Sequence, residues 1–121
     1  MNKSSVTYAH AKLKIDDYWN RGITGQGVKI CIVDDGVGTH DALPISGGYA
    51  CGRHTTYRQE NSHATHCAGI ALGRNLANGK PTGIAPGAHL YSIRMYYKRF
   101  ADRVFSLIEA IDYAIDQGID I

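Results

Sequence analysis

The stretch that decides the fold is Val28-Lys29-Ile30-Cys31-Ile32-Val33-Asp34-Asp35-Gly36. Its first six residues are apolar and mostly β-branched except for Lys29, a composition typical of a strand buried on both faces in a parallel sheet. Two carboxylates follow at the carboxyl end of this strand, where open α/β sheets place their ligand sites. Because successive side chains of a strand point to opposite faces, only one of the two carboxylates can orient a given partner.

The segments around this strand alternate between helix and strand patterns. The further predicted elements are, in order, a short amphipathic helix (15–20), a long loop region (37–60) with a weak strand signal at 49–51, a helix (63–73), a strand (89–95), a long helix (103–117) and the start of a third strand (119–121). This alternation predicts an α/β fold with a doubly wound parallel sheet. We expect residues 1–121 to form one domain, which is incomplete because its third strand has barely begun.

Composition indicates an ordinary globular chain and excludes several partner classes. Of 121 residues, 44% are hydrophobic and 20% charged, with 13 basic against 11 acidic side chains and a net charge of +2. The basic residues are scattered apart from Lys98-Arg99, so no nucleic-acid partner is expected. No apolar run approaches the ~18 residues that would indicate a membrane span, and residues 1–8 have no apolar signal core. We therefore expect no membrane partner, and a cytoplasmic protein as the chain stands or a secreted one if a leader has been removed.

The three cysteines are Cys31, Cys51 and Cys67. Three thiols cannot all pair with one another, and Cys31 sits inside the apolar strand. A disulfide framework is therefore not indicated, and free thiols are expected.

A second informative segment is Asn61-Ser62-His63-Ala64-Thr65-His66-Cys67-Ala68-Gly69-Ile70. Asn61 or Ser62 can cap a helix that begins near His63, because both side chains accept hydrogen bonds from the free N–H groups of a first turn. The strand end at Asp34 and the helix start at His63 are expected at the same edge of the sheet. We therefore predict that Asp34 and His63 lie within hydrogen-bond distance of each other.

Together the two segments resemble the Asp and His blocks of the subtilisin-like serine proteases, the subtilases. The resemblance covers residues 19–121 and includes the later Gly83-Ile84-Ala85-Pro86-Gly87-Ala88. It implies a serine-type endopeptidase that acts on protein or peptide substrates. Asp34 would accept the Nδ1–H of His63, and His63 would act as general base and then as general acid.

In that family the Ser nucleophile, the side-chain oxyanion donor and the specificity pocket come later than Ile121. The resemblance therefore implies the N-terminal portion of a catalytic domain, inactive by itself, whose partner is the C-terminal remainder of the peptidase domain. No cofactor is required by this resemblance. The family allows a structural calcium, for which Asp41 is a candidate ligand, whereas the loop over 75–82 does not match the family pattern.

Four features depart from the usual family pattern. Ala64 replaces a Gly, so its methyl group is expected beside the imidazole, and Asp35 replaces a Thr or Ser, as in the kexin-like branch. Cys67 resembles the proteinase K branch, in which a thiol lies under the catalytic His, and it also fits a small buried hydrophobe. The segment 96–102 has no Gly where the family has a substrate-pairing edge strand, so its use as a substrate platform stays open.

Two alternative classes are compatible with parts of the sequence. A receiver-like signalling domain would use the Asp34-Asp35 pair, but it also needs a carboxylate at the end of another apolar strand about 40 residues on, and none is found there. A non-catalytic zinc-binding module would use two ligand pairs, Cys51 with His54 and His63 with His66.

Overall fold

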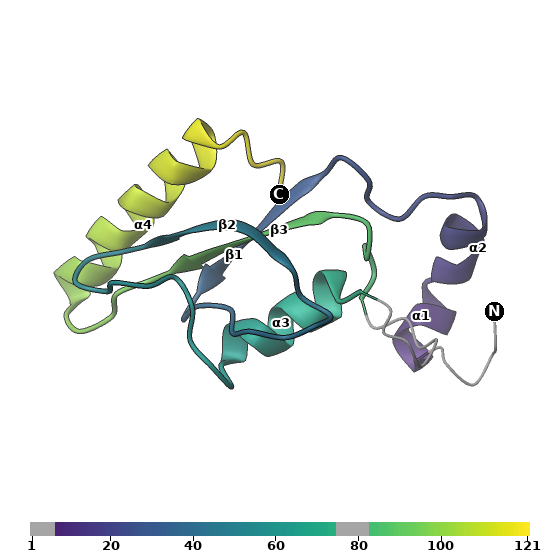
Figure 1. Ribbon diagram of the computed structural model, residues 1–121, viewed down its shortest axis with the longest axis horizontal. Helices are drawn as coiled ribbons and strands as arrows, with labels where there is room; N and C mark the ends of the chain where they lie inside the picture. The colour runs from purple at the N-terminus through teal and green to yellow at the C-terminus, as the bar shows by residue number, and fades with distance from the viewer. Residues whose placement is uncertain (1–6, 75–82) are drawn as a thin grey trace.

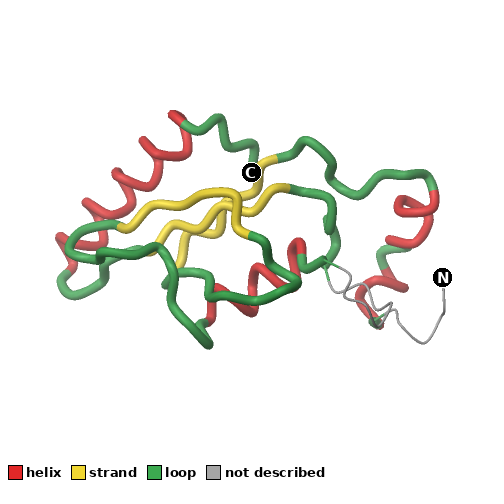
Figure 2. Tube along the Cα trace, viewed as in Figure 1, coloured by secondary structure: helices red, strands yellow, loops and turns green. Residues whose placement is uncertain are grey.

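The structure is a computed structural model that describes residues 7–74 and 83–121. Figures 1 and 2 show the strands side by side, α3 and α4 on opposite sides of them, and α1 and α2 together at one end. Helices on both sides of a parallel sheet define the doubly wound α/β fold that the sequence predicted. The elements are α1 (Tyr8–Lys12), α2 (Ile15–Asn20), β1 (Lys29–Asp34), β2 (Ile45–Ala50), α3 (His63–Leu72), β3 (His89–Arg94) and α4 (Phe100–Asp116).

The sheet has the order β1-β3-β2, and both pairs of strands are parallel. Side chains of the central strand β3 therefore supply both layers of the core. Leu90 packs in a cluster with Ala68 and Leu72 of α3, whereas Ile93 packs in a second cluster with Ala110 of α4. The alternation of side chains along β3 thus explains why one helix lies on each face.

Strand β1 lies at an edge of the sheet, and the prediction that both its faces are buried holds only in part. Val33 remains 43% exposed. The predicted third strand is present only as backbone pairing, in which Asp120 N–H donates to Lys29 O (3.0 Å) and Cys31 N–H donates to Ile121 O (2.8 Å). The edge of β1 that β3 leaves free is therefore partly paired.

The prediction of a long loop over 37–60 is wrong for β2. This strand contains Gly47 and Gly48, which lower intrinsic strand propensity. A Cβ at Gly48 would lie 2.5 Å from Ser92 O, and one at Gly47 would lie 2.9 Å from the ring of Tyr91. The glycines are therefore needed for the close approach of β2 to β3, and tertiary packing outweighs local propensity.

The helices agree with the predicted ranges except at the start of α4, which was predicted from residue 103. The carboxylate of Asp102 accepts a hydrogen bond from the backbone N–H of Arg99 (2.9 Å), so the helix begins at Phe100. Helix α1 was not predicted. None of the helices in the described part of the chain is long and apolar enough to cross a membrane.

The prediction of free thiols is confirmed for Cys31, Cys51 and Cys67. Burial raises the pKa of Cys31 to about 11, and the neighbouring Cys51 adds to this shift. Burial likewise raises the pKa of Cys51 to about 11, with a further contribution from Glu109. Both thiols therefore stay protonated at neutral pH and act as small hydrophobes of the core.

Candidate active site

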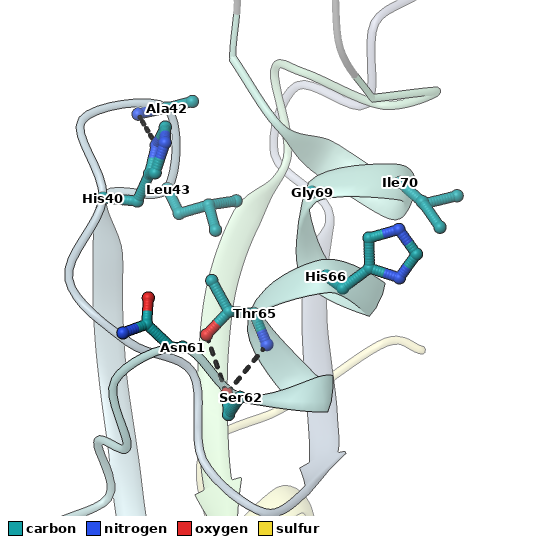
Figure 3. A pocket seen from close by; sticks show the side chains of 9 residues that line it. All are labelled: His40, Ala42, Leu43, Asn61, Ser62, Thr65, His66, Gly69 and Ile70. Atoms are coloured by element: carbon teal, nitrogen blue, oxygen red, sulfur yellow. Dashed lines mark hydrogen bonds between the residues drawn. The ribbon is translucent and has the colours of Figure 1, made fainter.

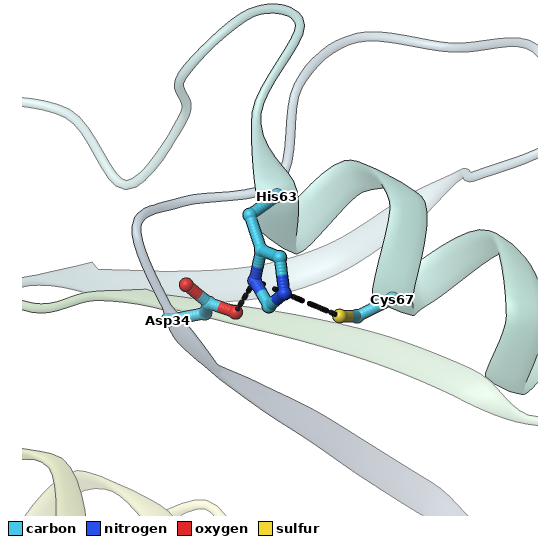
Figure 4. Close-up of side chains that lie close together, drawn as sticks. All are labelled: Asp34, His63 and Cys67. Carbon is cyan, nitrogen blue, oxygen red and sulfur yellow. Dashed lines mark hydrogen bonds and ion pairs between the residues drawn. The ribbon is translucent and has the colours of Figure 1, made fainter.

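Asp34 and His63 face each other across the carboxyl edge of the sheet. Asp34 is the last residue of β1 and His63 is the first of α3. The Asp34 Oδ2 lies 2.6 Å from the His63 Nδ1, which confirms the predicted hydrogen-bond distance (Figure 4). An ionised carboxylate can only accept, so a neutral imidazole bonded in this way carries its proton on Nδ1 and its lone pair on Nε2. The carboxylate side chain is 22% exposed and the imidazole is 69% exposed, so the ring is largely open to solvent.

Asp35 fixes the same turn of helix from the other side, a role that sequence analysis missed. Its Oδ1 accepts a hydrogen bond from the backbone N–H of Ala64 (2.9 Å). Asp34 Oδ1 in turn accepts from the Asp35 N–H (2.7 Å), so both oxygens of the Asp34 carboxylate are engaged. The two neighbouring carboxylates therefore bind one helix turn, one through the imidazole and one through the backbone. The sequence signal for this role was the second carboxylate of the Asp34-Asp35 pair. Asp35 can bind the helix backbone because it lies opposite the N-terminus of α3.

Ser62 is the N-cap of α3, one of the two capping residues considered from the sequence. Its Oγ accepts from the Thr65 N–H (3.1 Å) and donates to Gly36 O (2.6 Å). Gly38 N–H donates to Thr65 Oγ1 (2.8 Å). These bonds tie the first turn of α3 to the loop that follows β1, so the same contacts that start the helix also set the position of His63.

Ala64 and Cys67 follow His63 on the first turns of α3. Ala64 is fully buried in the core cluster with Leu90, and the expectation that its methyl group lies beside the ring stays a prediction. The sulfur of Cys67 lies 3.7 Å from Nδ1 and 3.6 Å from Nε2 of His63. These nearly equal distances place the sulfur over the face of the ring rather than in line with one nitrogen. The thiol therefore packs against the imidazole, as the resemblance implies.

Asp34, His63 and Cys67 are also a group that could hold a metal ion. Their oxygen, nitrogen and sulfur ligand atoms lie within 4.8 Å of one another, and imidazole and thiolate are ligands that zinc accepts. Asp41, the calcium candidate, is exposed and belongs to no such group in the described residues. The loop over 75–82, which was considered with it, lies outside the described residues.

The segment after β3 leaves the sheet beside the Asp34–His63 pair. Arg94 is the register partner of Asp34, and Met95 N–H donates to Asp34 O (2.8 Å). Burial, and then the negative charges of Asp34 and Asp35, raise the pKa of Tyr97. Residues 96–99 form no strand, and α4 begins directly after them.

Arg94 also anchors the loop that leads into α3. Its Nη1 donates to Arg58 O (3.1 Å) and its Nη2 to Gln59 Oε1 (2.8 Å). One guanidinium group thereby bonds the central strand to the loop that leads into α3.

A largely apolar groove of about 420 Å³ lies between α3 and the loop after β1 (Figure 3). Neither Asp34 nor His63 lines it. Its polar groups are already engaged in part, since His40 Nδ1 accepts from the Ala42 N–H (3.0 Å). The lining residues are His40, Ala42, Leu43, Asn61, Ser62, Thr65, His66, Gly69 and Ile70.

The two alternative classes are not supported by the geometry. Cys51 is buried against Ser106 O (3.5 Å), and His54 packs edge-on against Tyr96 (5.3 Å between ring centroids). Among the described residues, these two side chains do not gather with His63 and His66 into a metal-ligand group. A receiver-like site needs a carboxylate at another strand end, but β2 ends at Ala50 and β3 at Arg94.

The fold and the site together define the class of this protein. It is an α/β protein with an Asp–His pair at the carboxyl edge of its parallel sheet. The profile of the subtilase family matches residues 25–121, and the chain belongs to this family.

Several known proteins are similar to this chain. The minor extracellular protease Epr of Bacillus subtilis (strain 168) is 34% identical over 110 residues, which are 90% of this chain and 17% of that protein. Subtilisin Savinase of Lederbergia lenta is 32% identical over 119 residues, 97% of this chain and 44% of that protein. The crystal structure of MycP1 with its N-terminal propeptide removed superposes with a TM-score of 0.75 and 26% identity, over 92% of this chain and 35% of that one. The chain thus spans less than half the length of each of these relatives.

Proposed function

We propose that this chain supplies the acid–base half of a serine endopeptidase that cleaves protein or peptide substrates. The observation that carries the proposal is the 2.6 Å bond between Asp34 Oδ2 and the Nδ1 of a largely exposed His63 side chain. Membership of the subtilase family supports a serine-protease reaction for such a pair.

In this reaction each side chain has a defined role. Asp34 keeps the proton on Nδ1 and stabilises the imidazolium that forms. His63 Nε2 accepts the proton of a serine hydroxyl as that oxygen attacks the substrate carbonyl, and later donates it to the leaving amine. Asp35 positions His63 through the Ala64 N–H. These proton transfers need no cofactor, and a structural calcium with Asp41 as a ligand stays part of the family-based proposal.

Residues 1–121 would form the N-terminal part of one peptidase domain rather than a domain with its own active site. The nucleophile and the oxyanion donors would come from the C-terminal remainder of that domain, which is the partner that the proposal requires. Because the residues of such a triad act as a unit, residues 1–121 alone should not hydrolyse peptides.

Labelling with a fluorophosphonate tests the proposal, because this reagent reacts with an activated serine. The natural full-length protein should be labelled, and its His63→Ala variant should not be. His66→Ala is the matched control, since His66 is an exposed residue of the same helix that makes no contact with Asp34, and this variant should label like the wild type. The 121-residue chain alone should give neither labelling nor turnover of a broad peptide substrate.

Two results would contradict the proposal. Labelling that survives in His63→Ala would remove His63 from the reaction, and turnover by the 121-residue chain that the reagent blocks would reveal a serine nucleophile within it.

A further inference from the structure

A small basic pocket is formed by segments that follow β2 and β3 at the carboxyl edge of the sheet, the edge at which β1 ends in Asp34. It has a volume of about 260 Å³ and is lined by Arg53, Tyr96, Lys98 and Arg99. Arg53 belongs to the segment between β2 and α3, and the other three belong to the segment between β3 and α4. Small-molecule sites usually occupy about 300–1,000 Å³, so this pocket suits one side chain of a larger ligand.

The pocket carries positive charge that its surroundings do not fully neutralise. Arg99 is paired with Asp102, with 3.2 Å between Nε and Oδ2. Arg53 and Lys98 make no hydrogen bond or ion pair in the described part of the chain, although the charge of Arg53 reaches Asp102. Three cations therefore face one carboxylate, and two of the cations are available to an anionic group.

The walls of the pocket are held in place by contacts on both sides. Tyr96 N–H donates to Ser106 Oγ (3.1 Å), and Ser106 Oγ donates to Tyr96 O (3.2 Å), which fixes the tyrosine backbone to α4. Gly52 has φ +58°, and a Cβ there would lie 2.7 Å from the Tyr96 ring. A glycine is thus required where the Arg53 segment turns against Tyr96, so the two segments form a close and specific contact.

The pocket lies within reach of a peptide that also contacts His63. Lys98 is four residues beyond Arg94, which is the register partner of Asp34. A chain extends at most about 3.5 Å per residue, and neighbouring strands lie ~4.8 Å apart. Lys98 therefore lies within about 20 Å of Asp34. An extended peptide of about six residues covers this distance. The charges of Asp34 and Asp35 act on Tyr97, which supports the same proximity.

We propose that this pocket binds an acidic side chain of the peptide substrate, so that the enzyme prefers substrates with Glu or Asp a few residues from the cleaved bond. The inference rests on the proposed endopeptidase function and names its substrate class. The carboxylate would accept hydrogen bonds from Arg53 and Lys98, while the ring of Tyr96 would pack against its methylene groups.

The test compares peptides that differ only by Glu or Gln at each position around the cleaved bond. In the natural full-length protein, kcat/KM should favour the Glu peptide at one position by about five- to tenfold, because each exposed charge pair contributes about two- to fivefold. The double variant Arg53→Gln/Lys98→Gln should reduce this ratio to about one. The control Lys12→Gln/Lys14→Gln removes the same charge from exposed residues around α1, at the other end of the molecule, and should retain the preference (Figure 1).

A binding measurement separates this inference from the catalytic proposal. Fluorescence anisotropy of the same peptides with the full-length His63→Ala variant should give tighter binding of the Glu peptide, again lost in the Arg53→Gln/Lys98→Gln background. Tighter binding without turnover in the wild type would contradict the catalytic proposal and retain the pocket. The proposal that the pocket binds an acidic side chain would be contradicted by equal affinities, by no binding of either peptide, or by equal kcat/KM in an active enzyme.

Discussion

Asp34 and Asp35 both bind the first turn of α3. Asp34 binds the imidazole of His63, and Asp35 binds the backbone one residue later. Because Asp35 follows the last residue of β1, both carboxylates reach α3, one through the ring and one through the backbone. The ring orientation is therefore set twice, by a side-chain bond and by a backbone bond.

Replacing the carboxylate that orients the imidazole should remove most of the activity. In Asp34→Asn, the amide can donate to Nδ1 and favour the wrong tautomer, so kcat of the full-length enzyme should fall by about 10⁴-fold. Steady-state hydrolysis of a peptide measures this loss. Asp112→Asn, which changes an exposed carboxylate of α4, is the control and should leave kcat within about twofold. A similar kcat for Asp34→Asn and Asp112→Asn would show that Asp34 does not orient the base.

The sequence predicted the Asp34–His63 contact because a strand end and a helix start at one sheet edge are places that topology brings together. It did not predict the environment of the pair. Asp35 binds the backbone of the first turn of α3, and its position in the sequence did not indicate this contact. Such orientations depend on how α3 packs on the sheet, and the local residues do not determine this packing.

At the scale of secondary structure, the start of α3 depends on the loop after β1. Ser62 Oγ caps the helix and also donates to Gly36 O, and the residue is only 9% exposed. The N-cap bond alone contributes about 1 kcal/mol, and an unpaired buried carbonyl costs about 1–3 kcal/mol. The helix start and the strand end are therefore stabilised by one hydroxyl group.

Ser62→Ala should lower the free energy of unfolding by about 2 kcal/mol, because the cap is lost and Gly36 O loses its donor. Urea denaturation of the natural full-length protein measures this change. Ser46→Ala, on the exposed side of β2, is the matched control and should stay within about 0.5 kcal/mol of the wild type. Equal midpoints for the two variants would mean that the Ser62 bonds are not needed for the fold.

Elements with a strong periodic or apolar pattern were predictable, and β2 was not. For α2, α3 and β3 the predicted and observed bounds differ by at most one residue. In β2, Gly47 and Gly48 give no apolar alternation. These glycines are needed because a Cβ at either position would clash with Tyr91 or Ser92 of the neighbouring strand. Non-local fit of this kind leaves no signal in the segment itself.

At the scale of the whole molecule, His54 links the loop before α3 to the end of β3. Burial, and then the positive charge of Arg94, lower the pKa of His54 from its ordinary value of 6.5. The folded state therefore binds this proton more weakly than the unfolded state does. The stability that depends on neutral His54 is fully present above about pH 6.5, the ordinary pKa of histidine. This stability should be lost as the pH falls below about 6.5 toward the lower pKa of the folded state.

The unfolding midpoint should accordingly decrease between about pH 7.5 and pH 5, and His54→Gln should reduce that decrease. Thermal unfolding at a series of pH values measures the slope. His89→Gln, which changes an exposed histidine of β3, is the control and should leave the slope unchanged. A steeper slope in His54→Gln would contradict the direction of the shift.

Helix α4 turns its apolar stripe away from the sheet. Ser106 and Ala110 are its buried residues, and Tyr113 packs against the same cluster. Five apolar residues that recur at helical spacing along α4 are 44–72% exposed, and they are Val104, Leu107, Ile108, Ile111 and Ile115. An apolar stripe of this size on a helix surface usually marks a contact with another chain or segment.

The 121-residue chain should therefore self-associate through α4. Ile108→Gln/Ile115→Gln removes two apolar side chains from the stripe, and the variant should have a lower mass than the wild type by light scattering at equal concentration, because less apolar area is gained on association. Asp112→Gln/Asp116→Gln is the matched control on exposed polar positions of the same helix and should associate like the wild type. A wild-type chain that is monomeric with a cooperative unfolding transition would show that the apolar stripe of α4 need not be buried by another chain or segment. The C-terminal remainder of the peptidase domain, as its proposed partner, would then have to pack elsewhere.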